Sequence, residues 1–346
     1  MTNLHRTYRP ILAPLSVTSL FSSTILLGMV AHSSAVDADG HASGLGTAAT
    51  AAASIALPVP VPVMGISPFT GLPGRLGPVL AVKIDNARAA RPHTGVEKAD
   101  LVYVEQVEAG QSRLLALYSS ALPSRIGPVR SARESDLELL RQFGKPLLAY
   151  SGAQAALVPL IKKAPVWALP PEAAPTAFTR DPNRPAPHNL YLNPAKAQTA
   201  VPGADIAKDI GFRFGPAPTG GLAVRTHTVR FPGATFGFSW SVKTNKWMVA
   251  MDGEAYRTPS GSPIGTPTVV VQNVDVHASR FKDRWGSVSP YTETVGKGTA
   301  VVLRNGKSFK ANWSRPHAQA ATTFTTSAGE PMNFAPGQVW VLLTAR

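Results

Sequence analysis

The chain of 346 residues contains no cysteine. Disulfide bonds, thiol catalysis, cysteine-ligated metals and lipid attachment to a cysteine are therefore excluded within this sequence. Acidic residues are scarce as well: 20 Asp and Glu stand against 34 Lys and Arg, which gives a formal charge of +14. This excess favours anionic partners. The basic residues are scattered and no nucleic-acid-binding motif occurs, so no specific nucleic acid is expected.

Several catalytic signatures are also missing. The sequence has no Gly-x-Ser-x-Gly nucleophile elbow, no Walker-type phosphate loop and no His-Glu-x-x-His zinc motif. Beyond the N-terminal region it has no uninterrupted apolar run long enough to span a membrane. The enzyme classes that depend on these motifs are not expected.

The N-terminal region has the pattern of an export signal. Arg6 and Arg9 precede a largely apolar stretch, and small residues at 33–35 provide a cleavage site. We predict a signal peptide over 1–35, with a retained anchor as the alternative, followed by an Ala/Pro-rich linker over 36–63. The mature chain is expected to be secreted or in the extracytoplasmic cell envelope, without a cysteine-linked lipid.

Two halves with different patterns follow the linker. The first half predicts strands over 79–84, 101–107, 114–118 and 147–150 and helices over 132–143 and 153–162. A Pro/Gly-rich break at 215–221 separates it from a half of short β-rich runs, in which Asn305-Gly306 is a hairpin signal. The predicted fold class is α+β. A mixed α/β N-terminal domain over 64–214 would precede a smaller all-β C-terminal domain over 222–346.

The segment Gly127–Glu134 places two arginines at a predicted helix start. Ser131 and Glu134 have the spacing of a capping box. Arg130 and Arg133 would then lie where the helix dipole is already positive, which is unfavourable for a cation and favourable for a bound anion. The alternative is a structural network in which both arginines pair with nearby internal acids such as Asp136, Glu105 or Glu108.

Other polar residues are candidates to accompany this segment. Asp85 ends a predicted strand, where α/β sheets bind ligands, and it is a candidate catalytic base or magnesium ligand. His188 lies in a proline-rich loop and is a candidate general acid or base, with loop ordering as the alternative. The full set of candidate ligand-binding residues is Asn86, Arg91, Glu105, Glu108, Arg113, Arg125, Arg130, Ser131, Arg133, His188 and Asn189. For the acids, a buried ion-pair network is the competing interpretation.

Motifs along the mature chain carry a family resemblance. They include Ser-Pro-Phe-Thr-Gly-Leu at 67–72, Val-Lys-Ile-Asp-Asn at 82–86, Gly-Gln-Ser-Arg at 110–113, Ile-Gly-Pro-Val-Arg-Ser-Ala-Arg at 126–133, Pro-His-Asn-Leu-Tyr at 187–191 and Pro-Gly-Gln-Val-Trp at 336–340. On these residues the chain resembles the YerB-like family (DUF3048), exported bacterial proteins described as lipoproteins of unknown function. The resemblance implies architecture and compartment, and no activity. In two respects the chain departs from the family: it lacks the lipid-bearing cysteine, and Ser-Pro-Ile-Gly-Thr at 262–266 replaces a segment that often carries His and Asp.

Three functions remain open from the sequence. The first is binding of an anionic envelope component, a wall polymer or a phosphorylated, lipid-linked precursor, at the arginine-rich helix start. The second is a metal-assisted phosphotransferase or hydrolase acting on wall precursors. It is motivated by a loose resemblance of Asp85 and the later arginines to LytR-CpsA-Psr wall-polymer transferases. The third is an envelope interaction scaffold. Four tryptophans are expected in the core rather than on a carbohydrate platform, namely Trp240, Trp247, Trp313 and Trp340.

Overall fold

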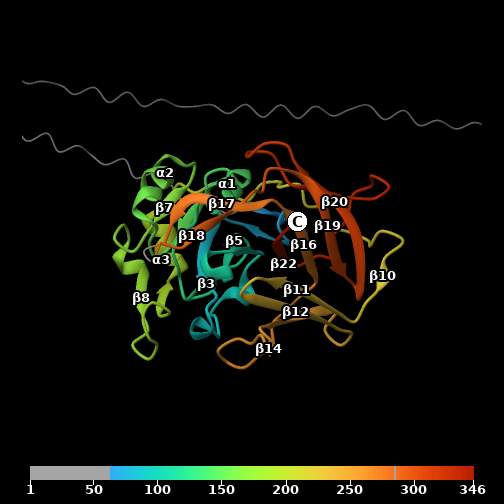
Figure 1. Ribbon diagram of the computed structural model, residues 1–346, viewed down its shortest axis with the longest axis horizontal. Helices are drawn as coiled ribbons and strands as arrows, with labels where there is room; N and C mark the ends of the chain where they lie inside the picture. Colours follow the sequence, from blue (N-terminus) through green and yellow to red (C-terminus); the bar gives the residue numbers. More distant parts are fainter. Residues whose placement is uncertain (1–62, 284–285) are drawn as a thin grey trace, which may run out of the picture. The chain divides into compact units, whose positions relative to one another are not determined.

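The computed structural model describes residues 63–283 and 286–346 (Figure 1). The predicted signal peptide, and the predicted linker except Val63, lie outside the described residues. The described residues belong to one compact unit and consist mostly of strands, with few and short helices. None of the described helices has the length and apolar character needed to cross a membrane.

One sheet of eleven strands crosses the whole unit. Its path runs through β10 (Leu222–Ala223), β20 (Lys307–Arg315), β19 (Gly296–Arg304), β16 (Thr268–Val274), β22 (Val339–Ala345), β4 (Leu101–Gln106), β5 (Ser112–Tyr118), β3 (Leu80–Asp85), β6 (Leu147–Ala149) and β7 (Trp167–Leu169), with β21 (Thr323–Thr326) paired to β20. Strands β22 and β4 pair in parallel. The two halves of the chain therefore share a single mixed sheet.

Smaller sheets and short helices surround this central sheet. A second sheet contains β11 (Thr226–Phe231), β12 (Ala234–Ser241), β13 (Lys246–Met251), β14 (Glu254–Ala255) and β15 (Gly265–Thr266). Three two-stranded sheets are formed by β1 (Val63–Ile66) with β2 (Pro73–Leu76), β8 (Phe178–Arg180) with β9 (Leu190–Leu192), and β17 (Val276–Lys282) with β18 (Val288–Thr292). The α-helices are α1 (Glu134–Leu140), α2 (Val158–Lys163) and α3 (Pro194–Ala200). The 3-10 helices are η1 (Arg88–Ala90), η2 (Val96–Lys98), η3 (Glu108–Gly110), η4 (Arg141–Phe143), η5 (Ala155–Leu157) and η6 (Pro175–Ala177).

Both faces of the central sheet are buried. On β3, Leu80 and Val82 pack in one apolar layer and Ala81 packs in the other. The first layer includes Phe236 and Trp247 of the second sheet, and the other includes residues of α1 and α2. Burial on both faces is the reason that β3, β4 and β5 are nearly continuous apolar runs in the sequence. The tryptophans Trp247, Trp313 and Trp340 are at most 2% exposed, which confirms the prediction that they belong to the core. Trp240, the fourth, is only partly buried and packs against the core.

The structure confirms most of the predicted elements and shortens the helices. Strands β3, β4, β5 and β6 lie where strands are predicted, and β4 and β5 pair as an antiparallel hairpin. The predicted helix over 132–143 is α1 followed by η4, and the one over 153–162 is η5 followed by α2. Asn305 and Gly306 form the predicted turn between β19 and β20. Their φ angles of 52° and 70° are left-handed, a conformation that Asn and Gly adopt at little cost.

Candidate functional site

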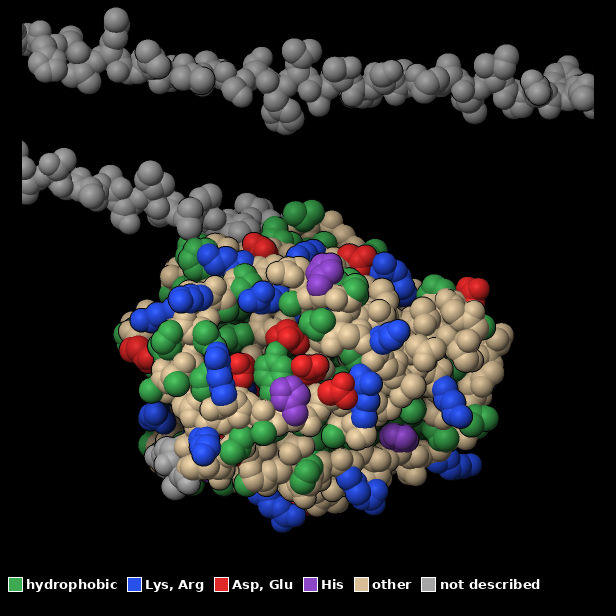
Figure 2. All heavy atoms as spheres, turned by 45° about the horizontal axis from the view of Figure 1, so that its top comes forward, with side chains coloured by type: hydrophobic (Ala, Val, Ile, Leu, Met, Phe, Trp, Pro, Cys, Tyr) green, Lys and Arg blue, Asp and Glu red, His purple; other side chains and the backbone are tan. Residues whose placement is uncertain are grey.

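The positive charge of the chain does not form one basic patch on the face that Figure 2 shows, where Lys and Arg side chains are spread over the surface. Because the surface charge is dispersed, the cavities of the protein are the better candidates for a binding site. Of three prominent cavities among the described residues, the largest measures about 1020 Å³. Arg113, Arg130 and Arg133 line it, and we call it the arginine cavity.

One wall of the arginine cavity comes from the first half of the chain. Strands β3 and β6 are parallel neighbours, so they end at the same edge of the central sheet. The segment that follows β6 is joined to the segment that precedes α1, because Ser151 N–H donates to Arg130 O (3.0 Å) and Ala132 N–H donates to Gly152 O (3.0 Å). The arginines are thereby held beyond the carboxyl ends of the strands.

The other wall comes from the second half. Strands β17 and β18 pass beside α1 (Figure 1), and Phe281, Lys282 and Ser289 line the arginine cavity. Ser279 Oγ donates to Glu134 (2.6 Å), which attaches β17 to the start of α1. Both halves of the chain are therefore needed to form the cavity.

The predicted capping box of Ser131 and Glu134 is wrong. Helix α1 begins at Glu134, its N-cap is Arg133, and Arg133 N–H donates to the Asp136 carboxylate (2.7 Å). The acid three residues after the N-cap is thus Asp136, because the helix starts later than the Ser131 spacing predicts. The helix start already has its own carboxylates, so it gives no support to an anion site. Any such site has to come from the side chains of the cavity.

Two of the three arginines have carboxylate partners. Arg133 pairs with Glu108 (2.6 Å), and Arg130 pairs through Nε with Asp85 (3.2 Å). Although burial opposes it, the hydrogen bonds from Arg133 and Ser289 lower the pKa of Glu108 to about 2. The network of internal acids that the sequence offers as an alternative is therefore present for these two residues.

Arg113 is different. Its residue is 8% exposed, and its guanidinium makes one hydrogen bond, from Nη1 to Ser131 O (2.8 Å). Within the described part of the chain, no carboxylate lies within ion-pairing distance of Arg113. Burial, and after it the positive charge of Arg133, lower the pKa of Arg113 to about 10, so the side chain is still charged at neutral pH. The carboxylates of Glu108 and Asp85 shift this pKa in the opposite direction, but from beyond ion-pairing distance. A buried cation without a direct carboxylate partner is costly, and an anion in the cavity would reduce this cost.

Further donors at the arginine cavity have no acceptor. Arg133 Nε is buried and makes no hydrogen bond within the described residues. The backbone N–H groups of Ser131, Ala153 and Gln154, three residues that line the cavity, likewise donate to no described residue. Unpaired guanidinium and backbone N–H donors around one space are the groups that bind oxyanions in proteins.

Beneath the cavity lies a buried ionic cluster that the sequence analysis missed in part. Lys83 of β3 is fully buried and donates to Glu105 of β4 and to Asp136 of α1 (2.7 Å). Burial and the neighbouring Asp136 carboxylate raise the pKa of Glu105 to about 7. The available signal was a lysine inside the apolar run over 79–84. Glu105 belongs to this cluster and does not line the cavity.

Asp85 is surrounded by donors. His188 Nδ1 lies 2.7 Å from Asp85 Oδ2, which Arg130 also contacts, and Ala87 N–H donates to Oδ1 (3.2 Å). Within the described residues, no group of three or more His, Asp or Glu side chains is arranged to hold a metal ion. This geometry does not fit a magnesium ion at Asp85. Arg130 lines the arginine cavity and contacts Asp85, and Asp85 contacts His188. The histidine therefore lies next to the cavity wall.

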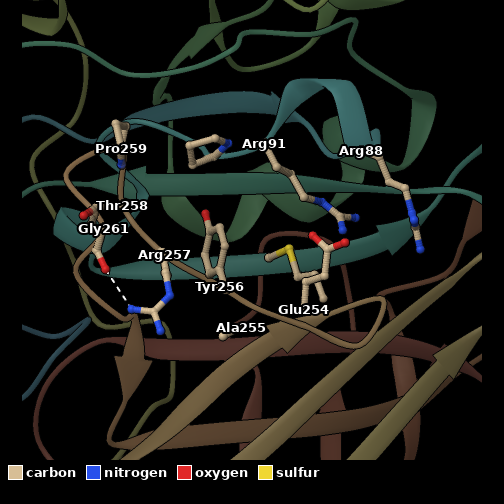
Figure 3. A pocket seen from close by; sticks show the side chains of 11 residues that line it. Arg88, Arg91, Glu254, Ala255, Tyr256, Arg257, Thr258, Pro259 and Gly261 are labelled. Carbon is tan, nitrogen blue, oxygen red and sulfur yellow. Dashed lines mark hydrogen bonds between the residues drawn. The ribbon is translucent and has the colours of Figure 1, made fainter.

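Asn86 and Arg91 lie together at a different place. Arg91 bonds to Asn86 Oδ1 (3.1 Å) and pairs with Asp252 (2.8 Å). It lines a cavity of about 370 Å³ together with Arg88, Arg257 and Tyr256 (Figure 3). Figure 3 shows Arg257 on the far side of Tyr256 from Arg91, bonded to Gly261 O (2.8 Å). Arg91 is compensated, and Arg88 and Arg257 are exposed, so this cavity is a weaker anion site.

Arg125 and Asn189 line none of the three cavities. Arg125 lies over the ring of Tyr191 (3.7 Å), and Asn189 accepts a hydrogen bond from Arg180 (2.7 Å). Of the predicted residues, the structure thus gathers Glu108, Arg113, Arg130, Ser131 and Arg133 around one cavity. Asp85 and His188 adjoin it through Arg130.

Comparison with protein families divides the described chain in two. The model described as "Protein of unknown function (DUF3048) N-terminal domain" matches residues 69–207, and the corresponding C-terminal domain model matches residues 227–341. The chain belongs to the DUF3048 family. The arginine cavity of this DUF3048 protein is lined by residues of both matched regions.

The family assignment agrees with similarity to one relative and one solved structure. "Putative lipoprotein YerB" from Bacillus subtilis (strain 168) is 25% identical over 275 residues, covering 76% of this chain and 80% of the relative. The crystal structure of the YerB protein from Bacillus subtilis matches with a TM-score of 0.68 at 19% identity, covering 80% of this chain and 96% of that one. The second similarity shows the fold alone.

Proposed function

We propose that this DUF3048 protein binds an anionic component of the cell envelope in the arginine cavity. The observation that carries the proposal is Arg113, a buried guanidinium without a carboxylate partner among the described residues. The charges of Arg130 and Arg133 are nearby, and several N–H donors around the cavity are unpaired. An anionic ligand supplies the missing negative charge and the missing acceptors.

The envelope location is part of the same proposal. It is supported by the printed description of the related YerB protein as a lipoprotein and by the pattern of a signal peptide over 1–35. The expected ligands are a wall polymer or a phosphorylated, lipid-linked precursor. A role as an interaction scaffold receives less support, because the second half of the chain contributes β17 and β18 to the cavity itself.

The catalytic alternative has one favourable observation, the hydrogen bond between His188 and Asp85. A carboxylate that holds Nδ1 of a histidine orients the ring for proton transfer at Nε2. The oxygens of Asp85 are occupied by donors, however, so a metal-assisted reaction through Asp85 is not supported. Binding is the function that the geometry favours.

Replacing Arg113 tests the proposal. We expect Arg113→Gln to weaken binding of inorganic phosphate, measured by titration calorimetry, by about tenfold to a hundredfold, because charge-assisted hydrogen bonds contribute about 1.5–3 kcal/mol each. Its melting temperature should stay the same or rise, since no carboxylate loses a partner. Arg88→Gln is the matched control, because it changes the net charge equally at an exposed position. Equal phosphate affinity in Arg113→Gln and the wild type would refute the proposal.

Arg133→Gln distinguishes a ligand-binding role from a structural one. This substitution leaves Glu108 without its guanidinium partner, so we expect a loss of stability of about 1–3 kcal/mol in addition to weaker binding. Urea unfolding should show a lower free energy of unfolding for Arg133→Gln than for Arg113→Gln. This difference would mean that Arg133 stabilises the fold and that Arg113 does not.

A further inference from the structure

The arginine cavity contains a polar side chain that an anion alone does not satisfy. Gln154 lines the cavity, and its Oε1 is buried without a hydrogen-bond partner among the described residues. No described residue bonds to its Nε2 either. A buried carboxamide oxygen that accepts no hydrogen bond is unusual and calls for a physical explanation.

Gln154 lies beside the donors already described. Its own backbone N–H and that of Ala153 donate to no described residue, and the segment is joined to Arg130 through Ser151. The terminal torsion of glutamine is broad, so the amide can turn toward the cavity at little cost. The hydroxyl of Ser131, which also lines the cavity, makes no hydrogen bond with any described residue. Unpaired amide and hydroxyl groups thus adjoin the unpaired cationic donors.

We infer that the anion bound in the arginine cavity is a phosphate ester of a polyhydroxylated group, whose phosphate faces Arg113 and whose hydroxyls bond to Gln154 and Ser131. This inference rests on the proposed anion binding and specifies the class of ligand. Guanidinium and N–H donors match phosphate oxygens, which only accept hydrogen bonds. A side-chain amide has one acceptor oxygen and two N–H donors. A hydroxyl group both donates and accepts, so it can bond to the amide whichever way the amide is turned. The volume of about 1020 Å³ leaves room for a phosphate together with an attached polyol.

A matched pair of probes separates the two parts of the ligand. sn-Glycerol 3-phosphate and propyl phosphate share the phosphate and a three-carbon chain, and only the first has hydroxyls. We expect the wild-type protein to bind sn-glycerol 3-phosphate at least about fivefold more tightly than propyl phosphate in titration calorimetry, because a site that bonds hydroxyls discriminates against the analogue that lacks them. Gln154→Leu should lower this preference at least about threefold, and because it keeps the backbone N–H it should leave the affinity for inorganic phosphate unchanged.

Gln111→Leu is the control, since Gln111 lines the same cavity at an exposed position. Gln154→Ala provides a second variant if the leucine impairs folding. Equal affinity of the wild type for both probes, or an undiminished preference in Gln154→Leu, would overturn the polyol inference while phosphate binding stands. Absence of phosphate binding, with no effect of Arg113→Gln, would instead refute the proposed function.

Discussion

Three cations near the carboxyl end of β3 differ in how carboxylates compensate them. Lys83 contacts two carboxylates, Arg133 pairs with one, and Arg113 has none within the described residues. Buried charges remain in a protein when they are paired. The fold therefore accounts for Lys83 and for the pairing of Arg133, whereas Arg113 is the residue for which we propose an anionic ligand.

The cluster around Lys83 makes stability depend on pH. Burial, and after it the neighbouring Asp136 carboxylate, raise the pKa of Glu105 from its ordinary 4.5 to about 7, although Lys83 opposes this shift. Between these two pH values the folded chain holds a proton that the unfolded chain releases. Glu105 therefore lowers the free energy of unfolding as pH rises through this window. Burial lowers the pKa of His93 from 6.5 to about 4. His93 therefore raises the free energy of unfolding as pH rises over nearly the same range.

The difference between the wild type and Glu105→Gln isolates the contribution of Glu105. We expect the wild type to lose stability relative to the variant as pH rises from about 4.5 to about 7, and the difference to stay constant above that range. Urea unfolding at a series of pH values measures it. Parallel stability curves for the two proteins would show that Glu105 does not titrate in this window.

At the scale of elements, the hairpin of β17 and β18 is held to α1 by polar contacts. Tyr291 OH donates to Glu138 (2.7 Å), as does Thr294 N–H (3.0 Å), and Thr292 N–H donates to Ser135 Oγ (2.9 Å). The hairpin closes one side of the arginine cavity. Its attachment to α1 therefore fixes the shape of the site.

Glu138→Ala should loosen the hairpin. The change removes the acceptor for Tyr291 and Thr294, and an unsatisfied buried group costs about 1–3 kcal/mol. We expect faster amide hydrogen exchange over 288–294 and weaker phosphate binding, with the central sheet still protected. Glu293→Ala is the control, because the Glu293 side chain is 45% exposed and pairs with His277 rather than with α1. Unchanged exchange in Glu138→Ala would mean that the hairpin is held by other contacts.

Some elements of the fold can be predicted from the sequence and others cannot. Strands β3 to β6 were predictable because burial on both faces requires nearly continuous apolar residues. The turn at Asn305-Gly306 was predictable because few residue types adopt a left-handed φ. The start of α1 was not predictable in this way. Two acids, Glu134 and Asp136, lie near it, and only Asp136 accepts a hydrogen bond from Arg133 N–H. Propensity and spacing do not distinguish such alternatives.

Parts of the candidate site were predictable and parts were not. The arginines in 110–113 and 126–133 stood out by charge and by their place after strands. Which arginine lacks a partner depends on contacts between distant segments, such as Arg133 with Glu108 and Arg130 with Asp85. Gln154 had no sequence signal at all, because an uncharged side chain becomes informative only when its surroundings are known.

For the whole molecule, the shared sheet changes the expected behaviour of the two halves. The break at 215–221 predicts a boundary, and the family models match on either side of it. Yet β22 pairs with β4 across that boundary, Gly215 N–H donates to Phe334 O (3.1 Å), and Arg304 donates to Gly215 O (3.0 Å). The sequence suggested two pieces that fold apart, whereas this pairing favours mutual dependence.

Separate expression of 64–214 and 222–346 tests this dependence. We expect neither segment to give a cooperative thermal transition alone, because each would expose a central strand edge and the apolar layers of the sheet. Mixing the two segments from denaturant should restore the transition and phosphate binding. A cooperative transition in either isolated segment would show that it is a self-sufficient domain.

The position of β22 has a consequence for the order of synthesis. This strand follows every other described strand in the chain, and yet it lies between β16 and β4 inside the sheet. While a ribosome makes the protein, the open edge of β4 stays without its neighbour until nearly all residues have emerged. Long-range parallel pairing of this kind forms slowly. The central sheet therefore cannot close until the last described strand has been made, and folding of the two halves is expected to be completed after synthesis rather than during it.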